Sequence, residues 1–161
     1  MSSANKLILI ALMFIGGSPV STAGGIKTVT LAVIVMVVYA TLHKRRNVEM
    51  FKRTVGQAVV GRAVTVILLF AAILLLASLI LTITEKQSGF PLGDLMFETA
   101  SALGTVGLST GITGSLTTMG KLIIIMVMLV GRLGPLTLLA AMTFNLKPAG
   151  YDYPTEPIVV G

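Results

Sequence analysis

An uncharged stretch of 22 residues, from Ala63 to Thr84, constrains this chain more than any other feature of its sequence. Arg62 precedes the stretch and Glu85 follows it, so the apolar run has a sharp boundary at each end. At a rise of about 1.5 Å per residue, a helix of this length extends about 33 Å, which is enough to cross the hydrocarbon core of a bilayer. The stretch therefore predicts a transmembrane helix.

The composition of the whole chain indicates the same environment. Hydrophobic residues make up 55% of the 161 residues and charged residues only 11%, whereas soluble domains contain about 25% charged residues. The chain has no cysteine, which excludes a disulfide scaffold, an iron–sulfur centre and a thiolate zinc site. Its single histidine, His43, leaves no His-based metal cluster or catalytic triad. We therefore expect an all-α membrane protein that is not an enzyme.

A second apolar stretch, from Leu122 to Leu146, contains one charged residue, Arg132. Gly131, Gly134 and Pro135 lie beside this arginine, and such residues weaken or kink a helix. Because a charge at the bilayer centre is costly, Arg132 is expected to face a protein interior or a water-filled path. It is then either a pore charge that forms an electrostatic barrier to cations or a structural residue whose head group reaches the membrane surface.

The first 43 residues contain two apolar pieces, Leu7 to Ile15 and Thr28 to Leu42, each too short to cross a bilayer. A segment rich in Gly, Ser and Thr, from Gly16 to Lys27, separates them. We interpret the three together as one membrane crossing broken by a loop at membrane depth, which is tolerated where it is buried in protein or lines a wet cavity. A phosphate-binding loop is disfavoured because Ile26 interrupts the required Gly-Lys pair. A plain helix kink remains the alternative to a pore-lining gate.

A cluster of positive charge, from His43 to Arg53, lies between the broken crossing and the long span. The positive-inside rule places this loop in the cytoplasm. Met1 then starts outside, and the tail from Lys147 to Gly161 is cytoplasmic. No nucleic-acid partner is expected, because neither interleaved aromatic residues nor a binding module accompanies the basic run.

The segment between the two long apolar stretches contains a short helical pattern, Leu95 to Leu103, which follows Pro91 and Asp94. This helix is too short to cross the membrane, so we predict a re-entrant segment. A run of small residues, Gly104 to Gly111, comes directly after it.

Within that run, Thr105-Val106-Gly107-Leu108 has the chemistry of a cation selectivity filter. In such a filter, backbone carbonyls replace the hydration shell of the ion, and glycine lets them point inward without a steric clash. The C-terminal end of the preceding helix would direct partial negative charge toward the same place. The alternative is an extracellular turn with no role in ion binding.

Two carboxylates, Asp94 and Glu98, belong to the short helix pattern or its start. No nucleophile, base or metal-ligand set accompanies them, so a catalytic pair is not expected. We expect them instead at the rim of a pore, where they concentrate cations.

The chain also contains an internal repeat. Lys6 to Gly17 and Lys121 to Arg132 match at six of twelve positions, including a shared lysine and a shared glycine. The broken first helix and the last helix are therefore predicted to be the same element of two successive helix–re-entrant–helix repeats.

Several motifs resemble the membrane subunits of the Ktr/Trk/HKT family of potassium transporters, in particular Ktr- and NtpJ-type subunits. They are Gly16–Pro19, Ser21–Thr28, Ser101–Gly111, Gly131–Thr137 and Tyr153–Pro157. The resemblance runs over nearly the whole chain. It implies a cation pore of four helix–re-entrant loop–helix repeats, of which about one and a half are present here.

By this resemblance, the chain divides into four regions. Residues 1–43 would form the broken last helix of the third repeat with its intramembrane Gly-rich loop, and residues 44–61 a cytoplasmic basic loop. Residues 62–146 would form the fourth repeat, with helix, re-entrant helix, filter strand and helix. Residues 147–161 would form a cytoplasmic C-terminal tail.

The resemblance also implies which residues act. The selectivity filter would comprise Thr105, Val106, Gly107, Leu108 and Ser109, with K⁺ at Thr105, Val106 and Gly107. The gating loop beneath it would comprise Gly16, Gly17, Ser18, Pro19, Ser21, Thr22, Ala23, Gly24, Gly25 and Lys27. Arg132 would be the pore charge that faces this loop. Val20 stands where the family usually has glycine, which would stiffen the loop.

The implied function is uptake of potassium, or another monovalent cation such as sodium, across the cell membrane without a bound cofactor. The implied partners are the lipid bilayer, a second copy of the full-length subunit in a homodimer, and a cytoplasmic nucleotide-binding regulatory ring. One filter segment of four cannot enclose an ion, so we expect the chain to act within a longer subunit. The alternative is a truncated, non-conducting membrane fragment with an assembly role beside a transporter or a sodium-pumping ATPase.

Overall fold

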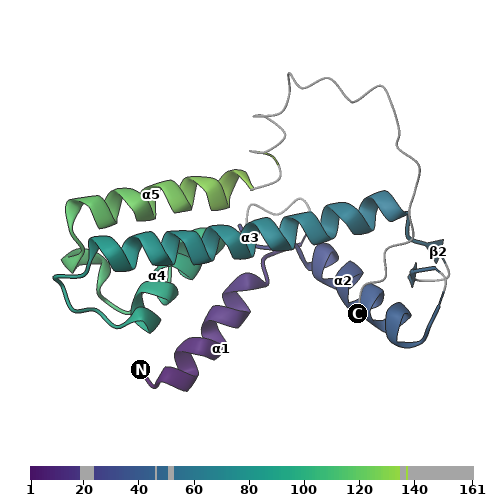
Figure 1. Cartoon of the computed structure of the whole chain (residues 1–161), viewed down its shortest axis with the longest axis horizontal. Helices are drawn as coiled ribbons and strands as arrows, with labels where there is room; N and C mark the ends of the chain where they lie inside the picture. The colour runs from purple at the N-terminus through teal and green to yellow at the C-terminus, as the bar shows by residue number, and fades with distance from the viewer. Residues whose placement is uncertain (19–23, 46, 51–52, 135–136, 138–161) are drawn as a thin grey trace.

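The computed structural model describes residues 1–18, 24–45, 47–50, 53–134 and 137 of the chain. Helices dominate this part, and the longest of them, α3, runs along the length of the molecule (Figure 1). In chain order the elements are α1 (Ser3–Phe14), α2 (Thr28–Leu42), β1 (Glu49–Met50), β2 (Arg53–Thr54), α3 (Gln57–Thr84), α4 (Leu92–Gly104), the 3-10 helix η1 (Thr113–Ser115) and α5 (Thr118–Leu133).

Helix α3 confirms that the predicted span is helical, and it begins earlier than the prediction. It has 28 residues, and among the described residues it is the one helix long and apolar enough to cross a membrane by itself. It begins at Gln57, inside the stretch 44–61 that the sequence assigned to a loop. A helix can start there because Arg62 can keep its charged head in water while its aliphatic stem lies along the helix.

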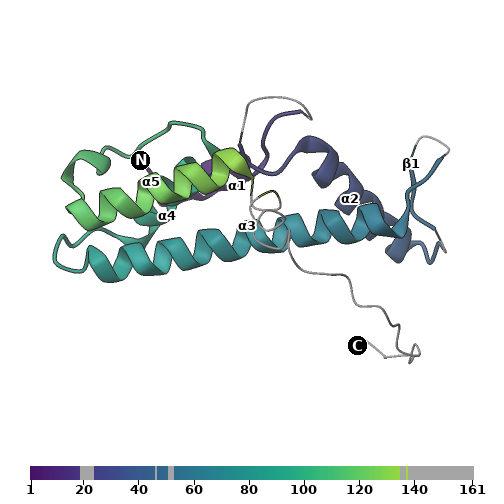
Figure 2. The same ribbon diagram turned by 90° about the horizontal axis from the view of Figure 1, so that it is seen from above.

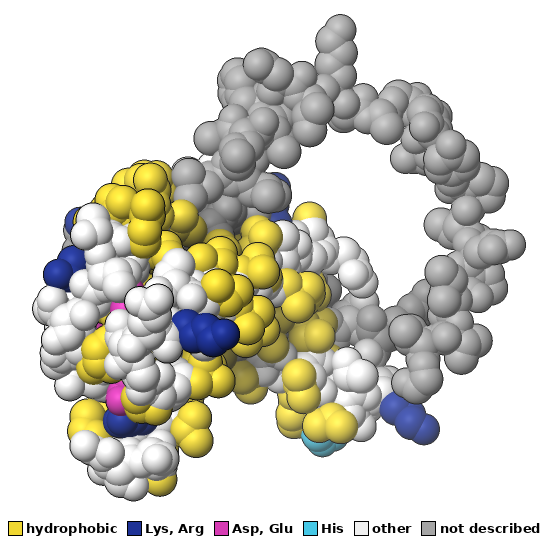
Figure 3. Space-filling model, turned by 60° about the vertical axis from the view of Figure 1, so that its left-hand side comes forward, with side chains coloured by type: hydrophobic (Ala, Val, Ile, Leu, Met, Phe, Trp, Pro, Cys, Tyr) yellow, Lys and Arg dark blue, Asp and Glu magenta, His cyan; other side chains and the backbone are white. Residues whose placement is uncertain are grey.

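The outer surface of the helices is strongly apolar. Leu75 and Ile83 of α3 and Met126 of α5 are 55%, 75% and 63% exposed. Figure 3 shows hydrophobic side chains spread over the helices, with only isolated basic side chains among them. Soluble proteins rarely expose so large an apolar area, so lipid or other membrane helices must cover this surface.

Helix α5 begins earlier than the predicted span, at Thr118, because Thr117 caps it. The Thr117 hydroxyl accepts a hydrogen bond from the Gly120 N–H at 3.1 Å, which satisfies one of the unpaired donors of the first turn. The helix ends at Leu133, and Gly134 follows with a φ of 81°. The rest of the predicted span, apart from Thr137, and the whole tail 147–161 lie outside the described residues.

Helices α1 and α2 are two separate helices on either side of the Gly-rich segment. Helix α1 packs against α4, whereas α2 packs against the first half of α3 (Figures 1 and 2). Three backbone hydrogen bonds join the two ends of the intervening segment: Gly16 N–H to the Ile26 carbonyl at 2.8 Å, Ile26 N–H to the Phe14 carbonyl at 3.1 Å, and Thr28 N–H to the Gly17 carbonyl at 3.3 Å. The end of α1 and the start of α2 therefore lie side by side, at the two ends of the Gly-rich segment.

Helix α4 lies at the centre of the packing, with α1, α3 and α5 around it. Leu95, Phe97 and Leu103 of α4 are each at most 1% exposed. Small residues allow close approach: a Cβ at Gly104 would lie 2.9 Å from the Met13 carbonyl oxygen, and one at Gly131 would overlap the Leu103 carbonyl. Close backbone contact of this kind is the usual means of helix association in membranes, where lipid is as apolar as the side chains.

Candidate functional site

The segment that follows α4 starts with an unusual backbone turn. Helix α4 ends at Gly104, and Thr105 adopts a left-handed conformation with a φ of 52°. This conformation costs a residue other than glycine about 1–2 kcal/mol. Two backbone hydrogen bonds close the helix end: Thr105 N–H to the Ala102 carbonyl at 3.1 Å, and Val106 N–H to the Ser101 carbonyl at 3.0 Å. The chain then turns away from the helix axis at a defined place.

The glycine of the predicted filter also has a positive φ, of 85°. No atom lies within 4 Å of the place where a Cβ at Gly107 would stand, so backbone conformation and not space requires glycine here. Its neighbours Val106 and Leu108 are 45% and 48% exposed. These side chains therefore leave the packed interior at the point where the backbone turns.

The first residue of the predicted filter contacts the predicted gating loop. The Gly24 N–H donates a hydrogen bond of 2.7 Å to the Thr105 hydroxyl, although the two residues are 81 positions apart. A Cβ at Gly24 would lie 2.6 Å from the same hydroxyl oxygen and 2.9 Å from the Gly104 carbonyl oxygen. Only glycine fits between the loop and the helix end.

Part of the predicted gating loop lies outside the described residues, namely Pro19, Ser21, Thr22 and Ala23. Of the rest, Gly16 and Gly25 pack directly on one another, since a Cβ on either would lie about 3 Å or less from the backbone of the other. Gly25 has a φ of 78°. Gly17 and Ser18 follow Gly16, and Lys27 directly precedes α2.

A cavity of about 530 Å³ brings the predicted pore charge together with the predicted filter. Arg132 of α5 lines it beside Thr105, Gly107, Leu108 and Ser109. Side chains of α4, α5 and the filter segment form its walls, and these include hydroxyl and charged groups as well as apolar ones. Glu98 and Ser101 of α4 and Thr113 also line it, together with apolar residues such as Ile124 and Met128.

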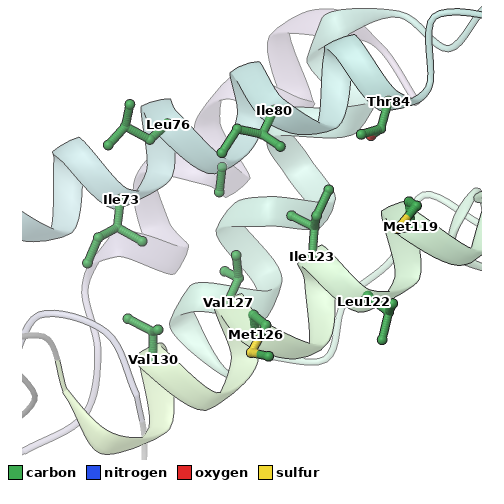
Figure 4. Close-up of a pocket in the computed structure, with 11 residues that line it drawn as sticks. Ile73, Leu76, Ile80, Thr84, Met119, Leu122, Ile123, Met126, Val127 and Val130 are labelled. Carbon is green, nitrogen blue, oxygen red and sulfur yellow. The ribbon is translucent and has the colours of Figure 1, made fainter.

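A second cavity, of about 480 Å³, lies between α3 and α5 and has a different character. Figure 4 shows Ile73, Leu76 and Ile80 of α3 across from Ile123 and Val127 of α5. Thr84 supplies the one hydroxyl group among its lining residues. Because an ion in apolar surroundings loses its hydration without compensation, this groove does not suit a cation.

The placement of Asp94 and Glu98 at a pore rim stays a prediction, but the structure shows that both carboxyl groups have side-chain partners. Glu98 is only 5% exposed, and its carboxyl group accepts hydrogen bonds from Ser109, Thr110 and Thr113. Asp94 forms an ion pair with Lys6, which joins the start of α4 to α1. Both carboxyl groups therefore hold elements of the fold together, and Glu98 also lines the cavity beside residues 105–109. The hydroxyl-rich sequence 109–113 was the one signal in the sequence for a buried acceptor.

Sequence reasoning used Glu85 only as the boundary of a span, but the residue is 2% exposed. Its Oε1 accepts hydrogen bonds from the Thr117 N–H at 2.9 Å and the Thr117 hydroxyl at 2.6 Å, and its Oε2 accepts one from Ser88 at 2.7 Å. Burial acts to raise the pKa of the Glu85 carboxyl, but the hydrogen bonds from Thr117 and Ser88, with the nearby Lys121 charge, hold that pKa below its ordinary value. Glu85 thus joins the end of α3 to the start of α5.

Comparison with known proteins gives a consistent result over the whole chain. Residues 1–149 match the family model TrkH, described as cation transport protein. The Ktr system potassium uptake protein B of Vibrio alginolyticus is 44% identical over 96% of this chain and 33% of its own length. The potassium/sodium uptake protein NtpJ of Enterococcus hirae and the Ktr system potassium uptake protein D of Bacillus subtilis are each 40% identical over 100% of this chain. The chain spans about a third of the length of these relatives.

Proposed function

The chain belongs to the TrkH family of cation transport proteins, and from this premise we propose that it supplies one selectivity-filter segment and the gating loop of a potassium-conducting pore. The relatives are potassium or potassium/sodium uptake proteins about three times as long. The proposed pore therefore includes further repeats beyond the residues of this chain. Within it, residues 105–109 coordinate the ion, and residues 16–25 lie below them.

The observation that carries this proposal is the contact between residues 24 and 105. The Gly24 N–H bonds the Thr105 hydroxyl at 2.7 Å, and no Cβ fits between them. A gate must lie on the ion path, next to the filter that it serves. The Gly-rich loop lies between two apolar helices and contacts the first residue of the filter-like segment. This contact meets the requirement.

The backbone of residues 105–107 supports a role in ion coordination. In an ordinary extended strand, successive carbonyl groups point to opposite sides. Thr105 and Gly107 have positive φ, and Val106 between them does not. Such an alternation can turn neighbouring carbonyls toward one side, where they replace the water around a cation. The C-terminal end of α4 adds partial negative charge at the same place.

The arrangement of the ends supports the proposed orientation. The hairpin β1–β2 and the basic residues around it precede α3, whereas the α3–α4 connection follows it at the opposite end (Figure 1). We place the hairpin and its flanking basic residues in the cytoplasm by the positive-inside rule. In the cytoplasm these residues are within reach of a nucleotide-binding regulatory ring. The complete subunit acts as a homodimer in the plasma membrane.

The filter proposal is tested by Gly107→Ser in the complete transporter, expressed in cells that lack other potassium uptake systems. Serine disfavours the positive φ, so the carbonyl orientation changes and the ratio of K⁺ to Na⁺ uptake falls by at least about tenfold, equivalent to about 1.4 kcal/mol. Gly93→Ser, at a glycine with open space and no positive φ, is the control. An unchanged ratio in Gly107→Ser, with normal membrane abundance, would show that residues 105–109 are not the filter.

The gating proposal is tested by Arg132→Ala in the same cells. Arg132 lines the cavity beside the filter segment, and a fixed positive charge there opposes cation passage. Removal of the charge is expected to raise uptake when the transporter is closed. Unchanged uptake in that state would remove Arg132 from the gate.

A further inference from the structure

Glu98 gathers the segment that follows the filter around a single carboxyl group. Its Oε1 accepts hydrogen bonds from the Ser109 hydroxyl at 2.7 Å, the Thr110 N–H at 2.8 Å and the Thr110 hydroxyl at 3.1 Å. Its Oε2 accepts one from the Thr113 hydroxyl at 2.6 Å. With four donors and 5% exposure, the group is nearly inaccessible to water.

The donors also lie close to one another, but because each hydroxyl group has one proton, Ser109 and Thr113 cannot both donate to Glu98 and also bond each other. The Ser109 and Thr113 hydroxyl oxygens are 2.9 Å apart, and Ser109 Oγ accepts a hydrogen bond from the Gly111 N–H at 2.9 Å. Residues 109–113 therefore form one hydrogen-bonded unit with Glu98 at its centre. In networks of this kind the members hold each other in place, so loss of one acceptor loosens all of them.

The filter segment is thereby fixed at both ends to the same helix. Its first residue, Thr105, is held by the hydrogen-bonded end of α4 and by Gly24. Its last residue, Ser109, is held by Glu98, which lies six positions before the end of α4. Between these anchors, no atom lies within 4 Å of the place where a Cβ at Gly107 would stand. The separation of the two anchors on a rigid helix sets how far the carbonyls of residues 105–109 are spread.

The set of donors around this position favours a glutamate. The Thr110 N–H can only donate, and Oε1 of Glu98 is its acceptor. If a glutamine placed its amide nitrogen at the position of Oε1, the Thr110 N–H would have no acceptor. A glutamine can keep one oxygen toward Thr110, but its nitrogen must then face Thr113. Aspartate keeps both oxygens but is one methylene shorter. Each substitution disturbs a different part of the network.

We propose that Glu98 is a positioning residue for the selectivity filter, which fixes the segment after residue 109 to α4 and thereby sets the preference between K⁺ and Na⁺. This inference rests on the proposed function, because it assumes that residues 105–109 coordinate the ion. Glu98 lines the cavity beside the filter segment, but both of its oxygens are occupied by hydrogen bonds to residues 109–113. It acts through Ser109, Thr110 and Thr113.

The test compares Glu98→Gln and Glu98→Asp with Glu85→Gln in the complete transporter. Glu85 is the matched control, since it is an equally buried carboxyl group with hydroxyl and N–H donors but lies outside the filter segment. K⁺ and Na⁺ uptake are measured over a range of concentrations, together with the amount of transporter in the membrane. We expect both Glu98 variants to lower the K⁺/Na⁺ uptake ratio by about three- to tenfold, mainly through a higher KM for K⁺. Glu85→Gln should lower the amount of transporter and leave the ratio within twofold of the parent.

Two results overturn the inference. If the Glu98 variants lower only the amount of transporter, as Glu85→Gln does, then Glu98 is a structural residue with no effect on the filter. If all three variants change the ratio alike, the effect is a general one on the fold. Gly107→Ser distinguishes failure of this inference from failure of the proposed function. If Gly107→Ser changes the K⁺/Na⁺ uptake ratio and the Glu98 variants do not, Glu98 does not position the filter. If Gly107→Ser leaves the ratio unchanged, residues 105–109 are not the filter. If Glu98→Gln does not reach the membrane, the K⁺/Na⁺ uptake ratios of Glu98→Asp and Thr113→Val provide the test instead.

Discussion

Two buried carboxyl groups on neighbouring elements are both stabilised by hydrogen bonds, but they connect different parts of the molecule. Glu98 and Glu85 are 5% and 2% exposed, and each accepts hydrogen bonds from serine and threonine hydroxyl groups and from one backbone N–H. The partners of Glu98 are 11–15 residues away and belong to one loop, whereas Thr117, the distant partner of Glu85, is 32 residues away at the start of another helix. Glu98 therefore shapes a loop, and Glu85 joins two helices.

The difference shows how similar networks can serve function or stability. The partners of Glu98 continue directly from the proposed filter, so a change there is expected to move the carbonyl groups of residues 105–109. The partners of Glu85 are Thr117, which begins α5, and Ser88 in the connection after α3. A change there alters how the helices pack and leaves residues 105–109 in place. Substitutions that separate these two effects test the comparison.

The largest expected loss of stability comes from Thr117→Val. The hydroxyl of Thr117 both donates to Glu85 and caps α5 through Gly120. Loss of a bond to a buried carboxyl group and of a helix cap lowers the free energy of unfolding by about 2–4 kcal/mol. Denaturant unfolding in detergent measures this loss, and the K⁺/Na⁺ uptake ratio of the protein that remains should be unchanged. A changed ratio would mean that the two networks are not separate.

Gly120→Ala should have a smaller effect on stability. A Cβ at Gly120 would overlap Oε1 of Glu85, so the carboxyl group must move away from Thr117. The weakened hydrogen bonds cost about 1–3 kcal/mol. Thermal unfolding in detergent is the measurement, and Gly114→Ala, at a glycine with open space, is the control. Equal melting temperatures for the two variants would show that the position of the Glu85 carboxyl group contributes nothing to stability.

Thr113→Val should have the opposite balance of effects to Thr117→Val, with a smaller loss of stability and a larger change in uptake ratio. It removes the one hydrogen bond to Oε2 of Glu98 from a partly exposed hydroxyl, which costs about 1 kcal/mol of unfolding free energy. The K⁺/Na⁺ uptake ratio should nevertheless fall about three- to fivefold, or roughly 0.7–1 kcal/mol. Parallel uptake assays on the two Thr→Val variants provide the measurement. A larger ratio change in Thr117→Val than in Thr113→Val would contradict the assignment of roles.

The smallest effect concerns pH. The pKa of Glu85 is lowered in the folded protein by its hydrogen bonds and Lys121, which outweigh burial. A carboxyl group with a lowered folded pKa contributes stability above its unfolded pKa, and this contribution is lost as the pH falls through the folded pKa. The melting temperature in detergent should therefore fall below about pH 5. Glu85→Gln should flatten this dependence, and an equally steep fall in that variant would assign it to other groups.

The amino-acid sequence alone predicted the features that depend on local composition. The uncharged run from Ala63 to Thr84 forms a helix across its whole length, and the two short apolar pieces beside the Gly-rich segment form separate helices. The motifs of residues 16–28 and 101–111 indicated the family, which the comparisons confirm. Hydrophobicity and glycine content act over a few consecutive residues, so they can be recognised without knowledge of the fold.

Only the tertiary structure decided what the polar residues inside the membrane protein contact. Glu98 and Asp94 were expected at a rim, and the structure adds that one is enclosed by residues 109–113 and the other is paired with Lys6 of α1. The contact between Gly24 and Thr105, and the position of Glu85 against Thr117, join residues that are far apart in the chain. A buried polar group is stable only where specific donors meet it in space, and that meeting depends on how whole helices pack. The sequence therefore determined which segments are apolar enough for a membrane, and the packing of α4 among its neighbours determined which side chains contact residues 105–113.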